Sequence, residues 1–78
     1  MWYVYVLKCH DGTYYTGCTS DLINRLDRHQ KGQVKYTAIR LPVELIVTIT
    51  FKDKYKAFMF EKYLKSGSGK AFMNKRLF

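Results

Sequence analysis

The stretch YVYVLKCHDGTYYTGCTS, residues 3–20, places four tyrosines around one tight turn. Tyrosine packs well in strands, so these residues have a purely structural explanation. A phenol can also transfer protons. Free tyrosine has a pKa of about 10, so a tyrosine base needs nearby positive charge to stabilise the phenolate. We therefore treat these tyrosines as candidate chemical groups as well as packing residues.

Two further candidates lie on the helix predicted over residues 21–31, SDLINRLDRHQKG in its local sequence. Leu22 and Leu26, with Ile23 more peripheral, form its apolar stripe. Arg25 and His29 are one turn apart beside that stripe. A guanidinium at an apolar border needs an anionic or hydrogen-bonding partner. The structural alternatives are a solvated surface arginine and a boundary histidine.

A single carboxylate borders the inner face of the helix predicted over residues 54–65. Ala57, Phe60 and Leu64 form that face, and Glu61 lies next to it. Mg²⁺ is often held by one or two carboxylates, with water and phosphate completing its six positions. The structural alternative is an ion pair with Lys65, worth about 0.3–0.5 kcal/mol. The other acidic residues are expected in caps, turns and strand ends, so we expect one metal at most.

The charge of the chain favours a polyanionic partner. Fourteen Lys and Arg residues oppose six acidic ones, which gives a net charge of +8. In so small a protein this surplus favours nucleic acid over a membrane surface, since no helix combines a basic face with a clean apolar one. Simple solubility is the alternative explanation, and composition alone does not exclude it. No signal peptide is expected, and Cys9 and Cys18 are too few for a disulfide framework. These features predict a cytoplasmic protein with reduced thiols.

The predicted elements follow the order β-β-α-β-α with a helical tail. Strands are expected over residues 2–9, 13–18 and 43–51, and helices over 21–31, 54–65 and, shortly, 71–78. Residues 33–42 are expected as a loop, and SGSGK as a helix-breaking loop. The last strand should place alternate residues on one face: Val43, Leu45, Val47, Ile49 and Phe51. The fold class is α+β, with a small three-stranded antiparallel sheet flanked by helices in one domain, 1–78.

These motifs together resemble the GIY-YIG nuclease superfamily, in particular its small single-domain bacterial members. The two family tripeptides correspond to Tyr3-Val4-Tyr5 and Tyr15-Thr16-Gly17. The helix carrying Arg25 and His29 and the segment FEKYLK with Glu61 follow in the family order. Each tripeptide alone is a weak signal, whereas the ordered set is specific and covers nearly the whole chain.

The resemblance implies a metal-dependent endonuclease that hydrolyses phosphodiester bonds in structured or damaged DNA, as in DNA repair, with DNA favoured over RNA. Tyr5 or Tyr15, or a water activated by one of them, would be the general base. Arg25 would stabilise charge on the phosphate, and Glu61 would hold Mg²⁺ or Mn²⁺. His29 would be a support residue or an alternative proton carrier.

Several positions depart from the family pattern. Tyr3 replaces the first glycine and Thr16 an isoleucine, and neither change removes a reactive group. Cys18 stands where some family nucleases have a lysine, and Asn74 corresponds only approximately to a family asparagine. These departures leave open a nucleic-acid-binding module with little catalysis. They also leave open a protein partner that supplies specificity.

The hairpin turn decides whether the two tyrosines can share a site. A two-residue turn at Asp11-Gly12 would send Tyr5 and Tyr15 to opposite faces of the sheet. A three-residue loop, residues 10–12, would put both on one face as diagonal neighbours and needs a left-handed residue, which Gly12 supplies. Asp-Gly is also a favoured two-residue turn, so local propensity does not decide between the two loops. Because the implied mechanism needs both phenols in one site, we predict the three-residue loop, with both phenols toward the Arg25 helix and Glu61 and no disulfide across the hairpin.

Overall fold

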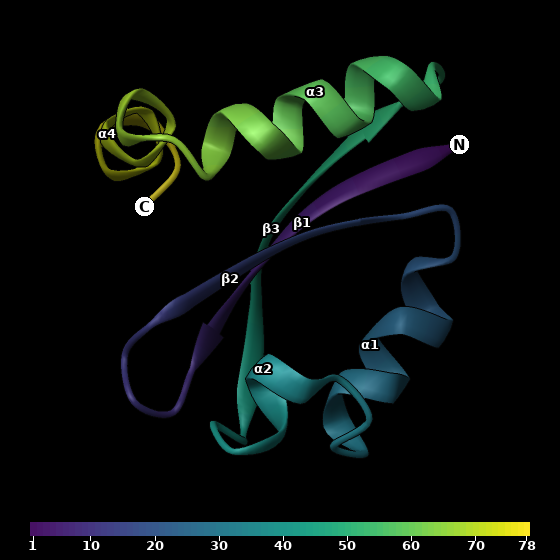
Figure 1. The fold of residues 1–78 in the computed structure, drawn as a ribbon, viewed down its shortest axis with the longest axis vertical. Helices are drawn as coiled ribbons and strands as arrows, with labels where there is room; N and C mark the ends of the chain where they lie inside the picture. The colour runs from purple at the N-terminus through teal and green to yellow at the C-terminus, as the bar shows by residue number, and fades with distance from the viewer.

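The computed structural model describes residues 1–78 and contains three strands and four helices (Figure 1). In chain order they are β1 (Trp2–Cys9), β2 (Tyr14–Thr19), α1 (Leu22–Gln30), α2 (Lys35–Ala38), β3 (Val43–Phe51), α3 (Lys54–Leu64) and α4 (Gly67–Arg76). The strands form one antiparallel sheet in the order β2-β1-β3. This confirms the predicted α+β class. None of the four helices is long and apolar enough to span a membrane.

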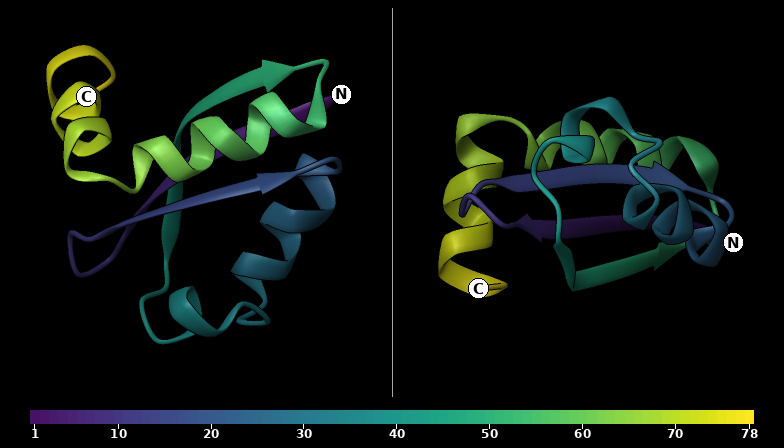
Figure 2. Two further views of the ribbon diagram at one scale, coloured as in Figure 1. Left: turned by 45° about the horizontal axis from the view of Figure 1, so that its top comes forward. Right: turned by 90° about the horizontal axis from the view of Figure 1, so that it is seen from below.

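Helices lie on both sides of the sheet, with α3 and α4 on one side and α1 and α2 on the other (Figures 1 and 2). Because successive side chains of the central strand β1 point to opposite faces, they contribute to two apolar clusters, one on each side of the sheet. The cluster toward α3 and α4 has the buried members Val4, Val6, Cys18, Ala57, Leu64 and Met73. The cluster toward α1 contains Tyr5, Leu7, Cys9 and Val43, packed by Leu22 and Leu26. Strand β1 carries apolar or aromatic side chains on both faces, a pattern that predicts burial on both, and residues 4–7 are all buried.

Strand β3 pairs with β1 through a bulge. Val6 and Leu7 lie opposite Val47 and Leu45, which leaves Ile46 as an extra residue. A shift of one residue moves the following side chains to the other face of a sheet. The prediction of a single apolar face is therefore wrong, because the bulge divides the residues between the α1 side (Val43, Leu45) and the α3 side (Val47, Ile49, Phe51).

The helix ends mostly follow their predicted signals. The Asp53 carboxylate accepts two backbone N–H groups of the first turn of α3, at 2.7 and 3.2 Å. Gly32 follows the end of α1 in the left-handed region, with φ 72°. By residue type Ser20 or Thr19 is expected to cap α1, but the cap is Asp21, whose carboxylate accepts the Asn24 N–H at 3.1 Å.

Three other local expectations are wrong. The loop over residues 33–42 contains the short helix α2. SGSGK does not form a loop, since Ser66 caps α4 and the helix begins at Gly67. Ile23 is 84% exposed and contributes nothing to the stripe of α1.

The hairpin between β1 and β2 has the predicted three-residue loop. The Cys9 N–H donates to the Thr13 carbonyl at 2.8 Å, and Leu7 pairs with Tyr15. Gly12 adopts φ 85°, the left-handed conformation that this loop requires. In this register Cys9 and Cys18 are free thiols in different clusters on opposite faces of the sheet.

Replacing Gly12 by alanine is expected to destabilise the protein by about 1 kcal/mol, because alanine is strained at positive φ. Urea unfolding measures the change. Gly67→Ala is the matched control: an added Cβ there meets open space, so stability should be unchanged or rise by up to about 1 kcal/mol. Equal losses for the two variants would contradict the loop geometry.

Candidate active site

Tyr5 and Tyr15 lie on the same face of the sheet. Tyr5 pairs with Gly17 and Tyr15 with Leu7, and the two phenol rings are 6.2 Å apart, centroid to centroid. The Tyr5 ring lies across Gly17 so closely that any Cβ at that position would overlap it. The glycine of the YTG tripeptide thus lets a buried phenol cross the edge strand. The sequence prediction that both tyrosines share one face is confirmed.

His29 links Tyr5 to the loop after α1. Its ring is fully buried, and its Nε2 lies 2.9 Å from the Tyr5 hydroxyl. Its Nδ1 lies 2.7 Å from the hydroxyl of Thr37, which is itself buried on α2. The histidine ring also packs edge-on against Tyr15, at 5.0 Å between centroids. His29 is therefore a central member of the site rather than a boundary residue.

The hydrogen bonds around His29 favour one tautomer. The Thr37 hydroxyl donates to the Val34 carbonyl at 3.3 Å, so it receives a proton from Nδ1–H rather than giving one. Nε2 then carries the free lone pair and accepts the Tyr5 O–H. In this arrangement the Tyr5 hydroxyl, the His29 Nδ1–H and the Thr37 hydroxyl each donate to an acceptor. Tyr5, His29 and Thr37 form a continuous chain of hydrogen bonds that ends at the Val34 carbonyl.

Arg25 and Glu61 both influence the pKa values of Tyr5 and Cys18. Burial raises the pKa of Tyr5 to about 12, against which the Arg25 guanidinium acts through hydrogen bonding and charge, while the charge of Glu61 raises it further. Burial also raises the pKa of the Cys18 thiol, where Glu61 again raises it and Arg25 lowers it. The charges of Arg25 on α1 and Glu61 on α3 thus act on the same two groups of β1 and β2 from opposite sides of the sheet.

The two charged residues differ in their partners. Arg25 is partly buried and forms no salt bridge. Glu61 pairs with Lys65 at 3.2 Å, and its side chain is only 19% exposed. The structure thus contains the ion pair that was the structural alternative for Glu61. A second Glu61 oxygen stays outside that contact. The candidate site therefore contains one cation without a carboxylate partner, Arg25, and one largely buried carboxylate, Glu61.

The donor set limits what metal the site can hold. No group of three or more His, Cys, Asp or Glu side chains is arranged to bind an ion. A lone carboxylate near a phosphate-binding surface fits Mg²⁺, which keeps most of its ligands as water and phosphate. Glu61 is the residue that would hold it.

Two contributors carried no recognisable sequence signal. Thr37 lies in a segment that reads as a loop, and only the short helix α2 brings its hydroxyl to His29. Tyr36, the preceding residue, packs its ring at a tilt against that of Tyr15, with 5.6 Å between the centroids. The Arg40 guanidinium lies over the Tyr36 ring, 4.0 Å from its centroid. Nothing in the periodicity of residues 33–42 indicates either contact.

Comparison with known proteins agrees with this geometry. The family model described as the GIY-YIG catalytic domain matches residues 1–76. The chain belongs to this family, a nuclease family, as its motifs predict.

Its relatives are small UPF0213 proteins. One from Streptococcus agalactiae is 44% identical over 70 residues, which cover 88% of this chain and 80% of the relative. One from Staphylococcus saprophyticus is 42% identical over 67 residues, covering 85% and 82%. The solution NMR structure of a UPF0213 protein from Bacillus halodurans superposes with a TM-score of 0.61 at 38% identity, covering 96% of this chain and 84% of that one.

The His29 site predicts how stability depends on pH. Burial, and then the charges of Arg25 and Arg28, lower the pKa of His29 below 6.5. The unfolded chain therefore binds more protons, so the free energy of unfolding should fall as the pH drops below about 6.5. Urea unfolding from about pH 8 to about pH 5 measures this slope.

The other histidine provides the control for that experiment. His10 is exposed, so His10→Gln should keep the wild-type slope. His29→Gln should flatten it between about pH 6.5 and pH 5. A wild-type stability that rises as the pH falls through this range would contradict a buried, neutral His29.

Proposed function

We propose that the protein is a metal-dependent endonuclease that hydrolyses phosphodiester bonds in structured or damaged DNA. The observation that carries the proposal is the buried contact between the Tyr5 hydroxyl and His29 Nε2, with Arg25 and Glu61 acting on the same phenol. A neutral proton acceptor, a phenol, a cation and a carboxylate can together supply general base catalysis, charge stabilisation and a metal ligand for phosphodiester hydrolysis. The location we propose is the cytoplasm.

The raised pKa of Tyr5 argues for a relay rather than a standing phenolate. With a pKa of about 12, only about one Tyr5 in 10⁵ is ionised at neutral pH. In a relay, the attacking water gives a proton to the Tyr5 oxygen while the Tyr5 proton passes to His29 Nε2. The lowered pKa of His29 keeps that nitrogen unprotonated and ready at neutral pH. Thr37 holds the ring in the required tautomer.

Arg25 would neutralise charge that develops on the phosphate. Its guanidinium has no carboxylate partner, so its donors are available to phosphate oxygens. A Mg²⁺ or Mn²⁺ ion held by Glu61 would supply Lewis-acid stabilisation of the leaving oxygen. Tyr15, packed on His29 and Tyr5, would position the phosphate at the mouth of the site.

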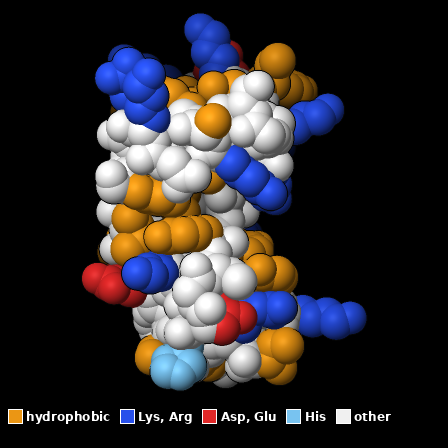
Figure 3. Space-filling view, turned by 90° about the vertical axis from the view of Figure 1, so that its left-hand side faces the viewer, with side chains coloured by type: hydrophobic (Ala, Val, Ile, Leu, Met, Phe, Trp, Pro, Cys, Tyr) orange, Lys and Arg blue, Asp and Glu red, His pale blue; other side chains and the backbone are white.

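The charge distribution supports DNA binding across α3 and α4. Residues 52–78 hold eight basic residues and only two acidic ones; the basic residues are Lys52, Lys54, Lys56, Lys62, Lys65, Lys70, Lys75 and Arg76. Figure 3 shows Lys and Arg side chains above and below a band of hydrophobic side chains on the face that includes the hairpin, with Asp and Glu side chains among them in the lower half. Such a face suits phosphates that flank a bound strand.

One observation favours the second candidate, a binding module with little catalysis. Cys18 stands where some family nucleases have a lysine, and a buried thiol cannot supply the positive charge of that lysine. Activity that is slow, or that needs a protein partner for substrate choice, agrees with this difference.

Glu61→Gln is expected to reduce cleavage at least about 100-fold, because the metal loses its charged ligand. The fold should lose less than about 0.5 kcal/mol, since the replaced contact is a helical ion pair with a largely exposed lysine. Nicking of plasmid and structured oligonucleotides with Mg²⁺ or Mn²⁺ measures the rate, and thermal melting checks the fold.

Asp27→Asn is the matched control, because Asp27 forms the same kind of pair with Lys31 on α1, at 2.8 Å, away from the site. It should cleave at the wild-type rate. Cleavage by Glu61→Gln at that same rate would refute the role of the carboxylate. A wild type that binds DNA but cleaves no substrate of the panel would favour the binding module.

Binding should depend steeply on salt. If the basic face neutralises about five phosphates, the slope of log K against log [salt] on duplex DNA should be about −4 to −5. Fluorescence anisotropy of a labelled duplex measures it. An affinity that stays constant between low and physiological salt would exclude the phosphate backbone as the main contact.

A further inference from the structure

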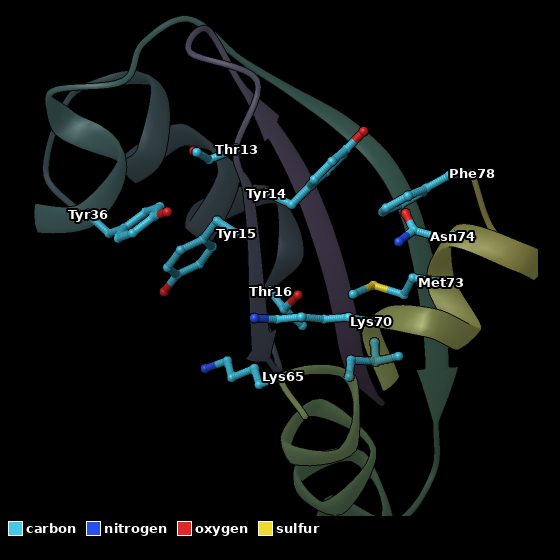
Figure 4. A pocket seen from close by; sticks show the side chains of 11 residues that line it. Thr13, Tyr14, Tyr15, Thr16, Tyr36, Lys65, Lys70, Met73, Asn74 and Phe78 are labelled. Carbon is cyan, nitrogen blue, oxygen red and sulfur yellow. The ribbon is translucent and has the colours of Figure 1, made fainter. Parts of the chain in front are cut away.

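A pocket of about 620 Å³ opens at the β2 edge, beside the candidate active site (Figure 4). We call it the edge pocket. It is lined by residues of the hairpin and β2 (Thr13, Tyr14, Tyr15, Thr16), of α2 (Tyr36) and of α3 and α4 with their flanks (Leu64, Lys65, Lys70, Met73, Asn74, Phe78). Its volume lies within the range of about 300–1,000 Å³ that small-molecule sites occupy. A single nucleotide is a ligand of this size.

Aromatic rings line two sides of the edge pocket. Because neighbouring residues of a strand point to opposite faces, Tyr14 and Tyr15 serve opposite sides of the β2 edge. Tyr14 stacks on Phe78 at 4.4 Å with an interplanar angle of 17°, and Tyr15 packs against Tyr36. Tyr14, Tyr36 and Phe78 are nevertheless 40–44% exposed. Ring surface left in water at a concave site is suited to a planar, apolar-faced ligand such as a nucleobase.

Polar groups of the edge pocket suit the rest of a nucleotide. Lys70 forms no salt bridge, and its side chain extends from α4 toward β2 (Figure 4). Asn74 offers an amide with donors and an acceptor, which can read the edge of a base. Strand β2 is at the edge of the sheet. Since Cys9 and Thr13 are a hydrogen-bonded pair, alternation turns the backbone groups of Tyr14 and Thr16 outward, into the pocket.

Two residues join the edge pocket to the proposed chemistry. Tyr15 lines the pocket and also packs on Tyr5 and His29. Lys65 lines it as well, and pairs with Glu61. A nucleotide in the pocket would therefore be a direct neighbour of the phosphate that Arg25 and Glu61 address.

We infer that the edge pocket binds one unpaired nucleobase next to the scissile phosphate, so that the substrate is DNA with an unpaired nucleotide at the cleavage position. A paired base has both faces stacked and cannot offer one to Tyr14 or Tyr36, whereas a bulged, looped or single-stranded base can. This inference rests on the proposed nuclease function and names its substrate class.

The test uses binding without cleavage. Wild-type protein in EDTA is titrated against a duplex with a single bulged 2-aminopurine, and against the same duplex with that base paired. The bulged duplex should bind at least about tenfold more tightly, and stacking should quench its 2-aminopurine fluorescence. Equal affinities, or fluorescence that does not change on binding, would overturn the inference.

Variants assign the preference to the pocket. Tyr14→Thr keeps a strand-forming residue, Phe78→Ala removes its stacking partner, and each should reduce the preference for the bulge about tenfold. Tyr55→Ala, at a ring that is 77% exposed on α3 and outside the pocket, is the control and should keep it. Lys70→Gln, which leaves the core intact, should weaken binding of the bulged duplex more than the paired one. Unchanged preferences in all three pocket variants would refute the assignment.

Failure of this inference and of the proposed function give different results. Metal-dependent cleavage of fully paired and bulged duplexes at equal rates would leave the nuclease in place and remove the pocket preference. If the protein binds the bulged duplex selectively, through Tyr14 and Phe78, but cleaves no DNA, the inference about the edge pocket holds and the proposed nuclease function is refuted.

Discussion

The structure depends on one buried polar contact, the hydrogen bond between the Tyr5 hydroxyl and His29 Nε2. Tyr5 is the largest fully buried side chain of the protein, so the phenol is at once core and candidate chemistry. A hydroxyl removed from water costs free energy unless it finds a partner. His29 satisfies that requirement, and Thr37 in turn satisfies the second histidine nitrogen. The α1–α2 segment is thus tied to β1 by hydrogen bonds as well as by apolar packing.

That contact also explains why β2 has a residue without a side chain where the Tyr5 ring lies. The Tyr5 ring must pass across β2 to reach the site, and it can do so only over a residue without a side chain, Gly17. Helix α3 then packs near the same strand and brings Glu61 to the border of the apolar cluster rather than into it. The edge strand β2 is therefore bordered by Tyr5 and by Glu61 of α3 instead of by another strand.

Sequence reasoning reached the fold because local patterns determine most of it, whereas the hairpin register also needed a functional requirement, since Asp11-Gly12 suits a two-residue turn as well. Alternation, Gly12 and the requirement that two phenols share a face together lead to the three-residue loop. The same reasoning failed where tertiary packing overrides local pattern. The bulge at Ile46 arises from pairing with β1, which no property of the β3 sequence reveals.

The site was partly predictable for the same reason. Spacing along α1 put Arg25 and His29 on one side of the helix, and the border position of Glu61 followed from helical periodicity. Neither rule predicts the depth of His29, since burial depends on how α2 closes over it. Thr37 carried no signal at all, because a threonine in an apparent loop gains a role only when a distant ring reaches it.

The cost of the buried polar chain bears on the choice between a nuclease and a binding module. A module that only binds DNA needs basic residues and exposed rings, all of which lie at the surface here. It does not need a hydroxyl, an imidazole and a second hydroxyl in the interior, where phenylalanine, leucine and valine of similar size would pack with no desolvation to offset. The chain instead holds a neutral His29 and a phenol whose pKa is about 12 in the interior, where their hydrogen bonds offset a desolvation cost that apolar side chains would avoid altogether. Proton transfer at a phosphodiester is a use for these groups that packing alone does not supply, and it is the physical reason for preferring the enzyme.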